Sequence, residues 1–485
     1  MDYSGMKVLV MGLGLHGGGL ESARYLLRHG AEITVTDLRD EQVLTPSIEK
    51  LEAAWGEVRA LGMGASPVRY VLGRHETEDF KNADMVIKNP GVRPDSPYLQ
   101  AAKRIETDIS LFLAASPARL FAVTGSKGKS STASALHWAL SNGVALGGRA
   151  WLGGNITVSP LTFLEELREG DDVVLELSSW QLGDLKNRTN SGGAPLLKPK
   201  AAVLTAIMPD HLDRYGTMDA YVADKRIIYQ GQDESDITVA GDDDWGRSFH
   251  AESRGRPLVY ADSALPGGQS GGWLESADGP GLARLCGPAW PGITGEIAEL
   301  VPERLLTPGY HQKRNTLAAA LALFGLGFEA RRICEAMGTF PGVEHRLELF
   351  HQARGIRFYN DSAATIPEAA AAAIEALGGE APLVLISGGT DKNLDFSPLV
   401  KAAPRAKAIM LLAGSGSEKL KSLFDEAGIQ YRGPFDDLER AVNAALEAAA
   451  PGDLVALSPG CTSFGMFHNE FDRGRKWKDA VMRLT

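Results

Sequence analysis

Residues 124–130 are the strongest candidates for binding or catalysis in this 485-residue chain, because they combine two glycines, two lysines and two serines. An apolar run precedes them and a helical pattern follows, which predicts a loop between a strand and a helix N-terminus. Backbone N–H groups of such a loop can wrap phosphates, Lys129 can neutralise phosphate charge, and Ser130 can bind Mg²⁺. The general phosphate-loop pattern has glycine at the position of Val123. We expect a nucleotide phosphate site, with an ordinary surface loop as the alternative.

Two more candidate residues follow apolar, strand-like runs. Glu176 ends one run, and His211 comes just after another, between Asp210 and Asp213. Ligands of open α/β sheets bind at the carboxyl ends of the strands, so Glu176 and Ser130 can contribute to one oxygen shell for Mg²⁺. His211 is either a metal ligand or a structural histidine. Lys225 lies in a predicted helix over 221–229, where a lysine is usually solvated.

A separate glycine pattern lies near the N-terminus. Gly12, Gly14 and Gly17 follow an apolar run, and Asp37 ends the next one. Glycines at this spacing allow a tight turn and close approach of a phosphate to a helix N-terminus, and an acid after the second strand can bind a ribose. The pattern is equally compatible with a nucleotide ligand and with a purely structural turn.

Three polar loops follow apolar runs in the last third of the chain. They cover 359–362, 387–392 and 457–463, and each contains small or charged side chains directly after a predicted strand. Loops at the same edge of one parallel sheet form a crevice, so we expect a second ligand site there, with ordinary surface loops as the alternative.

The elements that must position these loops are alternating strands and helices. We expect strands over 7–11, 33–37, 85–88, 120–123, 173–177, 202–207, 356–359, 383–386, 408–412 and 454–457. We expect helices over 19–29, 129–140, 313–326, 329–337, 367–377 and 438–450. The alternation predicts an α/β protein with mainly parallel sheets and three domains. These are a Rossmann-like N-terminal domain over 1–116, a P-loop ATPase-like central domain over 117–341 and a Rossmann-like C-terminal domain over 342–485.

Composition narrows the class of protein. The net charge of −11 disfavours nucleic acid as a partner. No apolar run approaches the roughly 18 residues of a membrane span, and the N-terminus runs directly into the first predicted strand, so we expect no membrane partner and no signal peptide. Cys286, Cys334 and Cys461 are widely spaced and odd in number. That pattern suits a reducing compartment, and we expect a cytoplasmic monomer.

In their order along the chain, the motifs resemble the Mur ligases of peptidoglycan synthesis, and most closely the branch of that family that adds glutamate. The segments that carry the resemblance are 12–15, 89–91, 124–130, 154–156, 176–182, 210–215, 221–225, 311–315, 345–346, 360–362, Lys392 and 457–459. The resemblance implies a ligase that uses ATP to add D-glutamate to UDP-N-acetylmuramoyl-L-alanine, through an acyl phosphate and a tetrahedral intermediate. It also implies two Mg²⁺ sites and a carbamylated Lys225.

The resemblance implies a role for each matching residue. Catalytic residues are Lys129, Glu176, His211, Lys225 and Lys392. ATP contacts are Gly125, Ser126, Lys127, Gly128, Lys129, Ser130, Ser131, Asn315, Arg346 and Asp361. Contacts to the UDP-linked substrate are Gly14, Leu15, His16, Asp37, Arg39, Asn89, Gly91, Asn155 and Ser178. Contacts to the incoming amino acid are Thr365, Lys392, Ser463 and Phe471. Metal ligands are Ser130, Glu176, His211 and Lys225.

The chain departs from the family pattern at three positions. Ala363 stands where the family often has lysine, Gln312 where it has asparagine, and Glu470 where an aromatic residue lies near the glutamate. The stretch 266–291, rich in Gly, Pro and Ser, matches no family feature. The first alternative is a sister Mur or folylpolyglutamate-type ligase that adds another amino acid, including L-glutamate. The others are a NAD-dependent oxidoreductase built on the first glycine pattern and a non-catalytic nucleotide switch.

Overall fold

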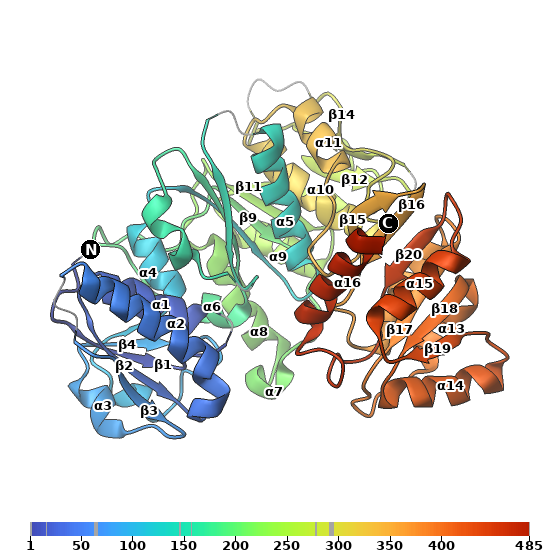
Figure 1. Cartoon of the computed structure of the whole chain (residues 1–485). Coiled ribbons are helices and arrows are strands. Elements are labelled where there is room, and N and C mark those ends of the chain that lie inside the picture. The colour runs from blue at the N-terminus through green and yellow to red at the C-terminus, as the bar shows by residue number, and fades with distance from the viewer. Residues whose placement is uncertain are drawn as a thin grey trace. The chain divides into compact units, whose positions relative to one another are not determined.

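The computed structural model describes residues 2–15, 17–62, 66–144, 147–156, 158–276, 279–290 and 295–484. The chain forms two compact units, of which the first comprises 1–276, 280–301 and 315–336, and the second 277–279, 302–314 and 337–485. Within the described residues the strands make three sheets, two in the first unit and one in the second (Figure 1). The predicted division at 116/117 and 341/342 stays a prediction.

The first sheet contains five parallel strands in the order β3-β2-β1-β4-β5. Its strands are β1 (Lys7–Met11), β2 (Glu32–Asp37), β3 (Arg69–Leu72), β4 (Met85–Lys88) and β5 (Ile105–Glu106). Its helices are α1 (Gly18–Arg28), α2 (Glu41–Ala60), α3 (Thr77–Asn82) and α4 (Asp108–Ala115), with a 3₁₀ turn at Leu99–Ala101. The strand order reverses between β1 and β4, where open α/β sheets form their ligand crevice.

The second sheet has nine strands in the order β14-β13-β12-β11-β10-β9-β6-β8-β7. They are β6 (Arg119–Thr124), β7 (Ala150–Gly154), β8 (Asp172–Glu176), β9 (Ala201–Leu204), β10 (Ile237–Gly241), β11 (Arg256–Ala261), β12 (Gly271–Leu274), β13 (Gly281–Arg284) and β14 (Ala298–Val301). Pairing is parallel from β7 to β12 and antiparallel from β12 to β14. The stretch 266–291 thus supplies two short strands, β12 and β13, next to the edge strand β14.

The helices that accompany this sheet include α5 (Lys129–Ala139), α8 (Met218–Lys225) and α10 (Tyr310–Gly325), on which Lys129, Lys225 and Asn315 lie. The others are α6 (Ser179–Asp184), α7 (Leu212–Tyr215), α9 (Asp244–Glu252) and α11 (Ala330–Gly338). Shorter turns are a π-helical segment at Leu140–Val144 and 3₁₀ segments at Pro160–Thr162, Leu164–Glu166 and Arg226–Tyr229. The helix predicted over 221–229 is therefore α8 continued by a 3₁₀ turn.

The strand predicted over 202–207 is shorter in the structure. β9 ends at Leu204, because the backbone beyond it bonds to the phosphate loop. The N–H of Thr205 donates to the Thr124 carbonyl at 2.8 Å, and the N–H of Ser126 donates to the Ala206 carbonyl at 2.8 Å. The end of this strand is thus one wall of the loop.

The third sheet has six strands in the order β15-β16-β20-β17-β18-β19, with only β15 antiparallel to its neighbour among the described strands. They are β15 (Glu348–Ala353), β16 (Ile356–Asn360), β17 (Leu383–Gly388), β18 (Ala406–Leu412), β19 (Arg432–Phe435) and β20 (Leu454–Leu457). The helices are α12 (Pro367–Gly378), α13 (Ser397–Ala402), α14 (Ser415–Ala427), α15 (Leu438–Ala448) and α16 (Glu470–Leu484), with a 3₁₀ turn at Ala403–Arg405.

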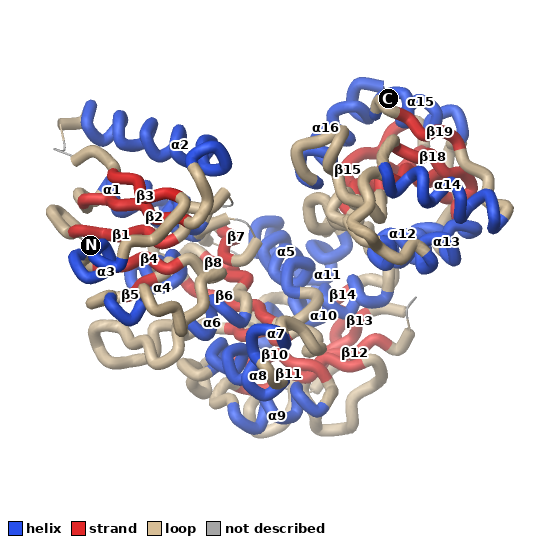
Figure 2. The backbone as a smooth tube through the Cα atoms, turned by 90° about the horizontal axis from the view of Figure 1, so that it is seen from below, coloured by secondary structure: helices blue, strands red, loops and turns tan. Residues whose placement is uncertain are grey.

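Burial on both faces explains why these strands read as continuous apolar runs. One core packs α12, α13 and α14 on one face of the third sheet, and a second core packs α15 and α16 on the other (Figure 2). Every residue of β17 and β20 is buried. Parallel strands between two helical layers lose the polar–apolar alternation of half-exposed sheets, so their sequence signal is a short apolar run. No helix among the described residues is both long and apolar enough to cross a bilayer.

A buried ion pair joins the first sheet to α6 inside the first unit, and it yields a stability prediction. Lys88 Nζ lies 2.7 Å from Asp184 Oδ2, with side-chain exposures of 3% and 10%. Burial lowers the pKa of Lys88 and raises that of Asp184, so the attraction does not fully offset desolvation. Lys88→Met should lower the free energy of unfolding by about 3–5 kcal/mol, because Asp184 is left buried and unpaired.

Urea titration of the variants measures this cost. The double variant Lys88→Met/Asp184→Leu should recover most of the loss, since no buried charge remains. Lys81→Met is the matched control, because Lys81 pairs with Glu78 on the exposed surface. A full loss that persists in the double variant would contradict the ion-pair explanation.

Candidate active site

The phosphate loop leaves β6, passes Gly125 and Gly128, and enters α5. Both glycines have positive φ, 148° and 90°. A Cβ at Gly125 would lie 1.9 Å from Thr205 Oγ1, and one at Gly128 would lie 2.4 Å from Asn315 Oδ1. Neither position has room for a side chain, so the two glycines are required by close approach as well as by backbone conformation.

Two lysines meet at one oxygen of this loop. Lys129 Nζ donates to the Gly125 carbonyl at 3.0 Å and to the Ser126 carbonyl at 3.1 Å. Lys225 Nζ donates to the same Gly125 carbonyl at 2.9 Å and lies 4.5 Å from the centre of the Tyr221 ring. Lys225 is only 1% exposed. The expectation from residue type, a solvated lysine, is therefore wrong for Lys225.

The environment of Lys225 favours its uncharged form. Burial, followed by the nearby charge of Lys129, lowers the pKa of Lys225 to about 7. Asp210, Asp224 and Glu176 oppose the shift without offsetting it. An amine with this pKa is substantially neutral at neutral pH and carries the lone pair that nucleophilic chemistry needs.

Glu176 ends β8 beside the loop with one carboxylate oxygen unsatisfied. The residue is 1% exposed, and its Oε1 accepts a hydrogen bond from Asn155 Nδ2 at 2.9 Å. Its Oε2 is buried and has no hydrogen-bond partner among the described residues. A buried, half-satisfied carboxylate is costly, and a cation at Oε2 would satisfy it. The carboxylate, together with the hydroxyl of Ser130, fits the oxygen-ligand preference of Mg²⁺.

His211 lies in the left-handed region at the N-terminus of α7, with φ 51°. Its ring lies against Trp180, with centroids 4.9 Å apart, and its side chain is 45% exposed. Its Nε2 lies 3.8 Å from Asp210 Oδ1. The imidazole is thus accessible on an unusual backbone, a combination typical of functional histidines.

The remaining loop residues divide into structural and accessible groups. Ser126 is buried, and its Oγ contacts Met208 and lies 2.9 Å from the Tyr221 hydroxyl. Lys127 is exposed, whereas Ser130 and Ser131 at the start of α5 are half-buried. Tyr221 contacts both Ser126 and Lys225. It lies in the segment 221–225 that carries the resemblance, but the sequence analysis assigned it no contact in the site. A tyrosine four residues before a lysine on one helix face is a weak signal.

The first sheet shows how the N-terminal glycine turn is held. Asp37 Oδ2 accepts from the Gly14 N–H at 3.3 Å, and its Oδ1 accepts from the Arg39 N–H at 3.0 Å. Asn89 Oδ1 accepts from the Gly91 N–H at 3.0 Å, and the Asn89 side chain lies within 3.8 Å of the position a Cβ would take on Gly14. Asp37 therefore fixes the turn through its carboxylate.

Three other predicted substrate contacts have different surroundings. Leu15 is 43% exposed at the glycine turn, which is unusual for a large apolar residue. Ser178 is the N-cap of α6 and exchanges hydrogen bonds with Gln181. Asn155 is exposed and orients Glu176. His16 lies outside the described residues.

In the second unit, β16 and β20 bring Asp361 and Ser458 together. Asp361 Oδ2 accepts from Ser458 Oγ at 2.6 Å, and its Oδ1 accepts from the Leu347 N–H at 3.1 Å. Burial raises the pKa of Asp361 to about 7. Arg346, directly before Leu347, is exposed, so Asp361 anchors the turn that presents Arg346.

Three of the predicted amino-acid contacts lie on loops that follow strands of the third sheet, and the fourth, Phe471, lies at the start of α16. Thr390 and Thr462 exchange backbone hydrogen bonds of 3.0 Å, which joins the loops after β17 and β20. Lys392 is exposed, with Nζ 5.5 Å from the Phe464 ring centre, and Ser463 is buried. Thr365 is half-buried after β16. Phe471 lies against His345, with ring centroids 5.5 Å apart.

A glycine loop that leads from a parallel strand into a helix, beside a buried carboxylate, defines the class of phosphate-loop α/β enzymes that act on nucleoside triphosphates. The first and third sheets add polar loops at their strand ends.

Comparison with known proteins identifies the family. Residues 6–110 match the Mur ligase MurD-like, N-terminal domain, residues 123–264 the Mur ligase middle domain, and residues 345–461 the Mur ligase, glutamate ligase domain. The UDP-N-acetylmuramoylalanine–D-glutamate ligase of Treponema pallidum is 39% identical over 98% of this chain and 97% of its own. The chain belongs to the Mur ligase family, an ATP-dependent ligase family, and the predicted three-domain α/β fold is confirmed.

Solved structures agree on the fold. The UDP-N-acetylmuramate–alanine ligase of Thermotoga maritima superposes with a TM-score of 0.55 at 17% identity, covering 99% of this chain and all of its own. The MurF ligase of Thermotoga maritima, solved with ADP, has a TM-score of 0.51 at 16% identity, covering 99% of this chain and 95% of its own.

The close contact at Gly128 can be tested by measuring ATP binding. Gly128→Ala should reduce the affinity for ATP by about 100-fold or more, because the new methyl group meets Asn315 and distorts the loop. Gly170→Ala is the matched control, since Gly170 has φ 94° and no atom within 4 Å of its would-be Cβ. Isothermal titration with a non-hydrolysable ATP analogue measures both. Equal affinities for the two variants would show that the close approach is unimportant.

Proposed function

We propose that this protein joins D-glutamate to UDP-N-acetylmuramoyl-L-alanine with cleavage of ATP to ADP and phosphate. The observation that carries the proposal is the pair of lysines that share the Gly125 carbonyl beside the half-satisfied Glu176. Two relatives of similar length, the UDP-N-acetylmuramoylalanine–D-glutamate ligases of Treponema pallidum and of a Roseiflexus species, support the same substrates. We further propose that the protein acts as a monomer in the cytoplasm.

The chemistry requires an activated carboxylate, because a free carboxylate is a poor electrophile. A carboxylate oxygen of the alanine attacks the γ-phosphorus of ATP, the bond to the β–γ bridging oxygen breaks, and ADP leaves. The glutamate amine then attacks the acyl carbon and loses a proton, and the tetrahedral intermediate expels inorganic phosphate. Lys129 offsets the phosphate charge in the first step, and positioning of the reactants can supply about 7–11 kcal/mol.

Glu176, Ser130, His211 and a carbamate on Lys225 are the residues that would hold Mg²⁺. The ion would supply charge neutralisation for the crowded phosphates and carboxylate. The carbamate forms when the nitrogen of the neutral Lys225 amine attacks the carbon of CO₂ and one proton is released, which converts a neutral side chain into an anionic oxygen ligand. The low pKa and burial of Lys225 support this assignment.

The other two sheets are proposed to bind the ends of the substrates. The turn of the first sheet, with Gly14, Leu15 and Arg39, would bind the UDP moiety. Asn89 and Gly91 would contact the same UDP-linked substrate, and Asn155 and Ser178 of the second sheet would contact its muramoyl side. Thr365, Lys392, Ser463 and Phe471 of the second unit would bind glutamate. Asn315, Arg346 and Asp361 would contact ATP.

The Lys225 assignment can be tested by chemical rescue. Lys225→Ala should lower kcat by about 100-fold, because an anionic oxygen ligand is lost, and acetate or formate should restore part of it. Lys186→Ala, which removes another lysine of the first unit, is the control. Normal activity of Lys225→Ala without added carboxylate would refute the carbamate.

The lysine pKa also predicts a dependence on CO₂ and pH. Only the neutral amine reacts with CO₂, and its fraction rises as the pH rises through about 7. Wild-type enzyme depleted of CO₂ should lose activity and regain it with bicarbonate, more fully above pH 7 than below. ¹³C NMR with labelled bicarbonate detects the carbamate directly, and Lys225→Ala should lack the signal.

Substrate choice can be tested by amino-acid-dependent phosphate release. With ATP and UDP-N-acetylmuramoyl-L-alanine present, D-glutamate should raise phosphate release by about 100-fold or more over L-glutamate, L-alanine or glycine. Release that responds equally to L-glutamate, or to another amino acid alone, would favour a sister ligase. ATP binding without any amino-acid-dependent release would favour a nucleotide switch.

A further inference from the structure

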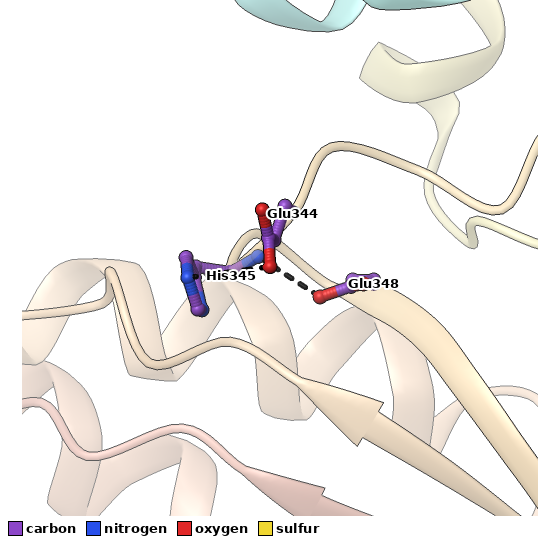
Figure 3. A group of neighbouring side chains, drawn as sticks. All are labelled: Glu344, His345 and Glu348. Carbon is purple, nitrogen blue, oxygen red and sulfur yellow. Dashed lines mark hydrogen bonds and ion pairs between the residues drawn. The ribbon is translucent and has the colours of Figure 1, made fainter. Parts of the chain in front are cut away.

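One cluster in the second unit has the composition of a cation site. Glu344, His345 and Glu348 bring three potential ligand atoms within 4.8 Å of one another, the only such group of three among the described residues (Figure 3). A lysine already provides the cation. Lys478 Nζ, from α16, lies 3.1 Å from Glu344 Oε1 and 2.5 Å from Glu348 Oε1. The ammonium group thus forms an ion pair with each of the two carboxylates.

This lysine acts on a strained turn. His345 and Leu347 have φ of 65° and 46°, in the left-handed region that non-glycine residues rarely occupy. Such a backbone conformation is unfavourable for a residue with a side chain and persists only where its surroundings hold it. Arg346, exposed between them, takes its direction from the turn.

The C-terminal helix holds the turn at several points. Phe471 packs on the His345 ring, and a Cβ on Gly474 would lie 2.1 Å from His345 Nδ1. The buried Arg473 donates to the Ser362 carbonyl at 2.8 Å and to the Cys461 carbonyl at 3.1 Å. One helix therefore fixes His345 and, through Ser362, the loop after β16.

The contacts of His345 define its protonation state. Asn360 Nδ2, which can only donate, lies 2.9 Å from His345 Nδ1, and Ser362 Oγ lies 3.1 Å from it. The Nδ1 atom must therefore accept and carry no proton. The His345 backbone N–H donates to Glu348 Oε2 at 3.1 Å, and Asn360 Nδ2 also lies 3.2 Å from that oxygen. Protonation of Nδ1 would break this network.

Four charged groups act on the imidazole. Burial lowers the pKa of His345, Glu344 and Glu348 oppose that shift, and Lys478 and Arg475 reinforce it. Burial, reinforced by Lys478, therefore lowers the pKa of His345 although two carboxylates adjoin it. Removing the ammonium should raise the histidine pKa and move protonation toward neutral pH.

We propose that Lys478 is a positioning residue for ATP binding: its ammonium, in place of a metal ion, ties Glu344 and Glu348 to the C-terminal helix and so holds the His345–Leu347 turn that presents Arg346. The inference rests on the proposed function only in that Arg346 contacts ATP. Lys478 itself touches no reacting atom. Its effect should appear in ATP affinity and in the acid limb of the pH profile.

The test compares Lys478→Met with Lys478→Arg and with the control Lys476→Met, whose lysine pairs with Asp472 on the same helix. Lys478→Met should raise the Kd and KM for ATP by about tenfold, the usual range of coupling between linked sites, and leave KM for the UDP-linked substrate unchanged. The acid limb of kcat/KM for ATP should move to higher pH. Lys478→Arg should restore both, and Lys476→Met should match wild type.

NMR titration of His345 in the full-length protein supplies a readout independent of turnover. The His345 pKa should rise in Lys478→Met and return in Lys478→Arg. Unchanged ATP affinity and histidine pKa in a folded Lys478→Met protein would overturn the inference, as would a uniform loss in all kinetic constants with an unchanged pKa. If Lys478→Met fails to fold, Lys478→Gln gives the same comparison. Because the Kd for ATP is measured without an acceptor, failure of the proposed D-glutamate activity would remain distinguishable.

Discussion

The arrangement of the phosphate-loop site depends on one backbone carbonyl oxygen, that of Gly125. Gly125 O accepts hydrogen bonds from Lys129 and Lys225, and such proximity of two ammonium groups in a buried site is unfavourable. This repulsion disappears when one amine is neutral. Burial and the charge of Lys129 lower the pKa of Lys225 to about 7, which favours loss of its proton. Nearby, Glu176 has a buried oxygen without a partner among the described residues. The site thus has excess positive charge on one side and an uncompensated carboxylate on the other, which suits polyphosphate together with a divalent ion.

The loop can hold this arrangement because its neighbours leave no room for alternatives. Thr205 and Asn315 occupy the space that side chains at Gly125 and Gly128 would need. In the first and third sheets, hydrogen bonds rather than close packing hold the backbone of the candidate binding turns. Asp37 fixes the first glycine turn through two backbone N–H groups, and Asp361 fixes the turn before Arg346. In the first and third sheets a buried acid at a strand end thus fixes the backbone, while Leu15 and Arg346 nearby stay exposed.

Much of this fold could be predicted from sequence, since buried parallel strands appear as short apolar runs and each is followed by a helix. The same apolar runs show where each strand ends. The positions of the phosphate loop, of Glu176 and of the three loops of the last sheet, all at strand ends, were therefore predictable. The burial of Lys225 was not, because helix periodicity does not reveal that α8 packs against the loop. The role of α16 was equally hidden: Gly474, Arg473 and Lys478 act through contacts with residues more than a hundred positions away. His345 and Leu347 gave no sign of their left-handed conformation.

The central claim is that the site activates a carboxylate by phosphorylating it, so that one carboxylate oxygen leaves with the phosphate. UDP-N-acetylmuramoyl-L-alanine labelled with ¹⁸O in its alanine carboxylate, incubated with ATP and D-glutamate, tests this most directly. Mass spectrometry of the released phosphate should find one ¹⁸O atom per phosphate, in proportion to the amide formed. Phosphate free of ¹⁸O, formed alongside the amide product, would contradict the account.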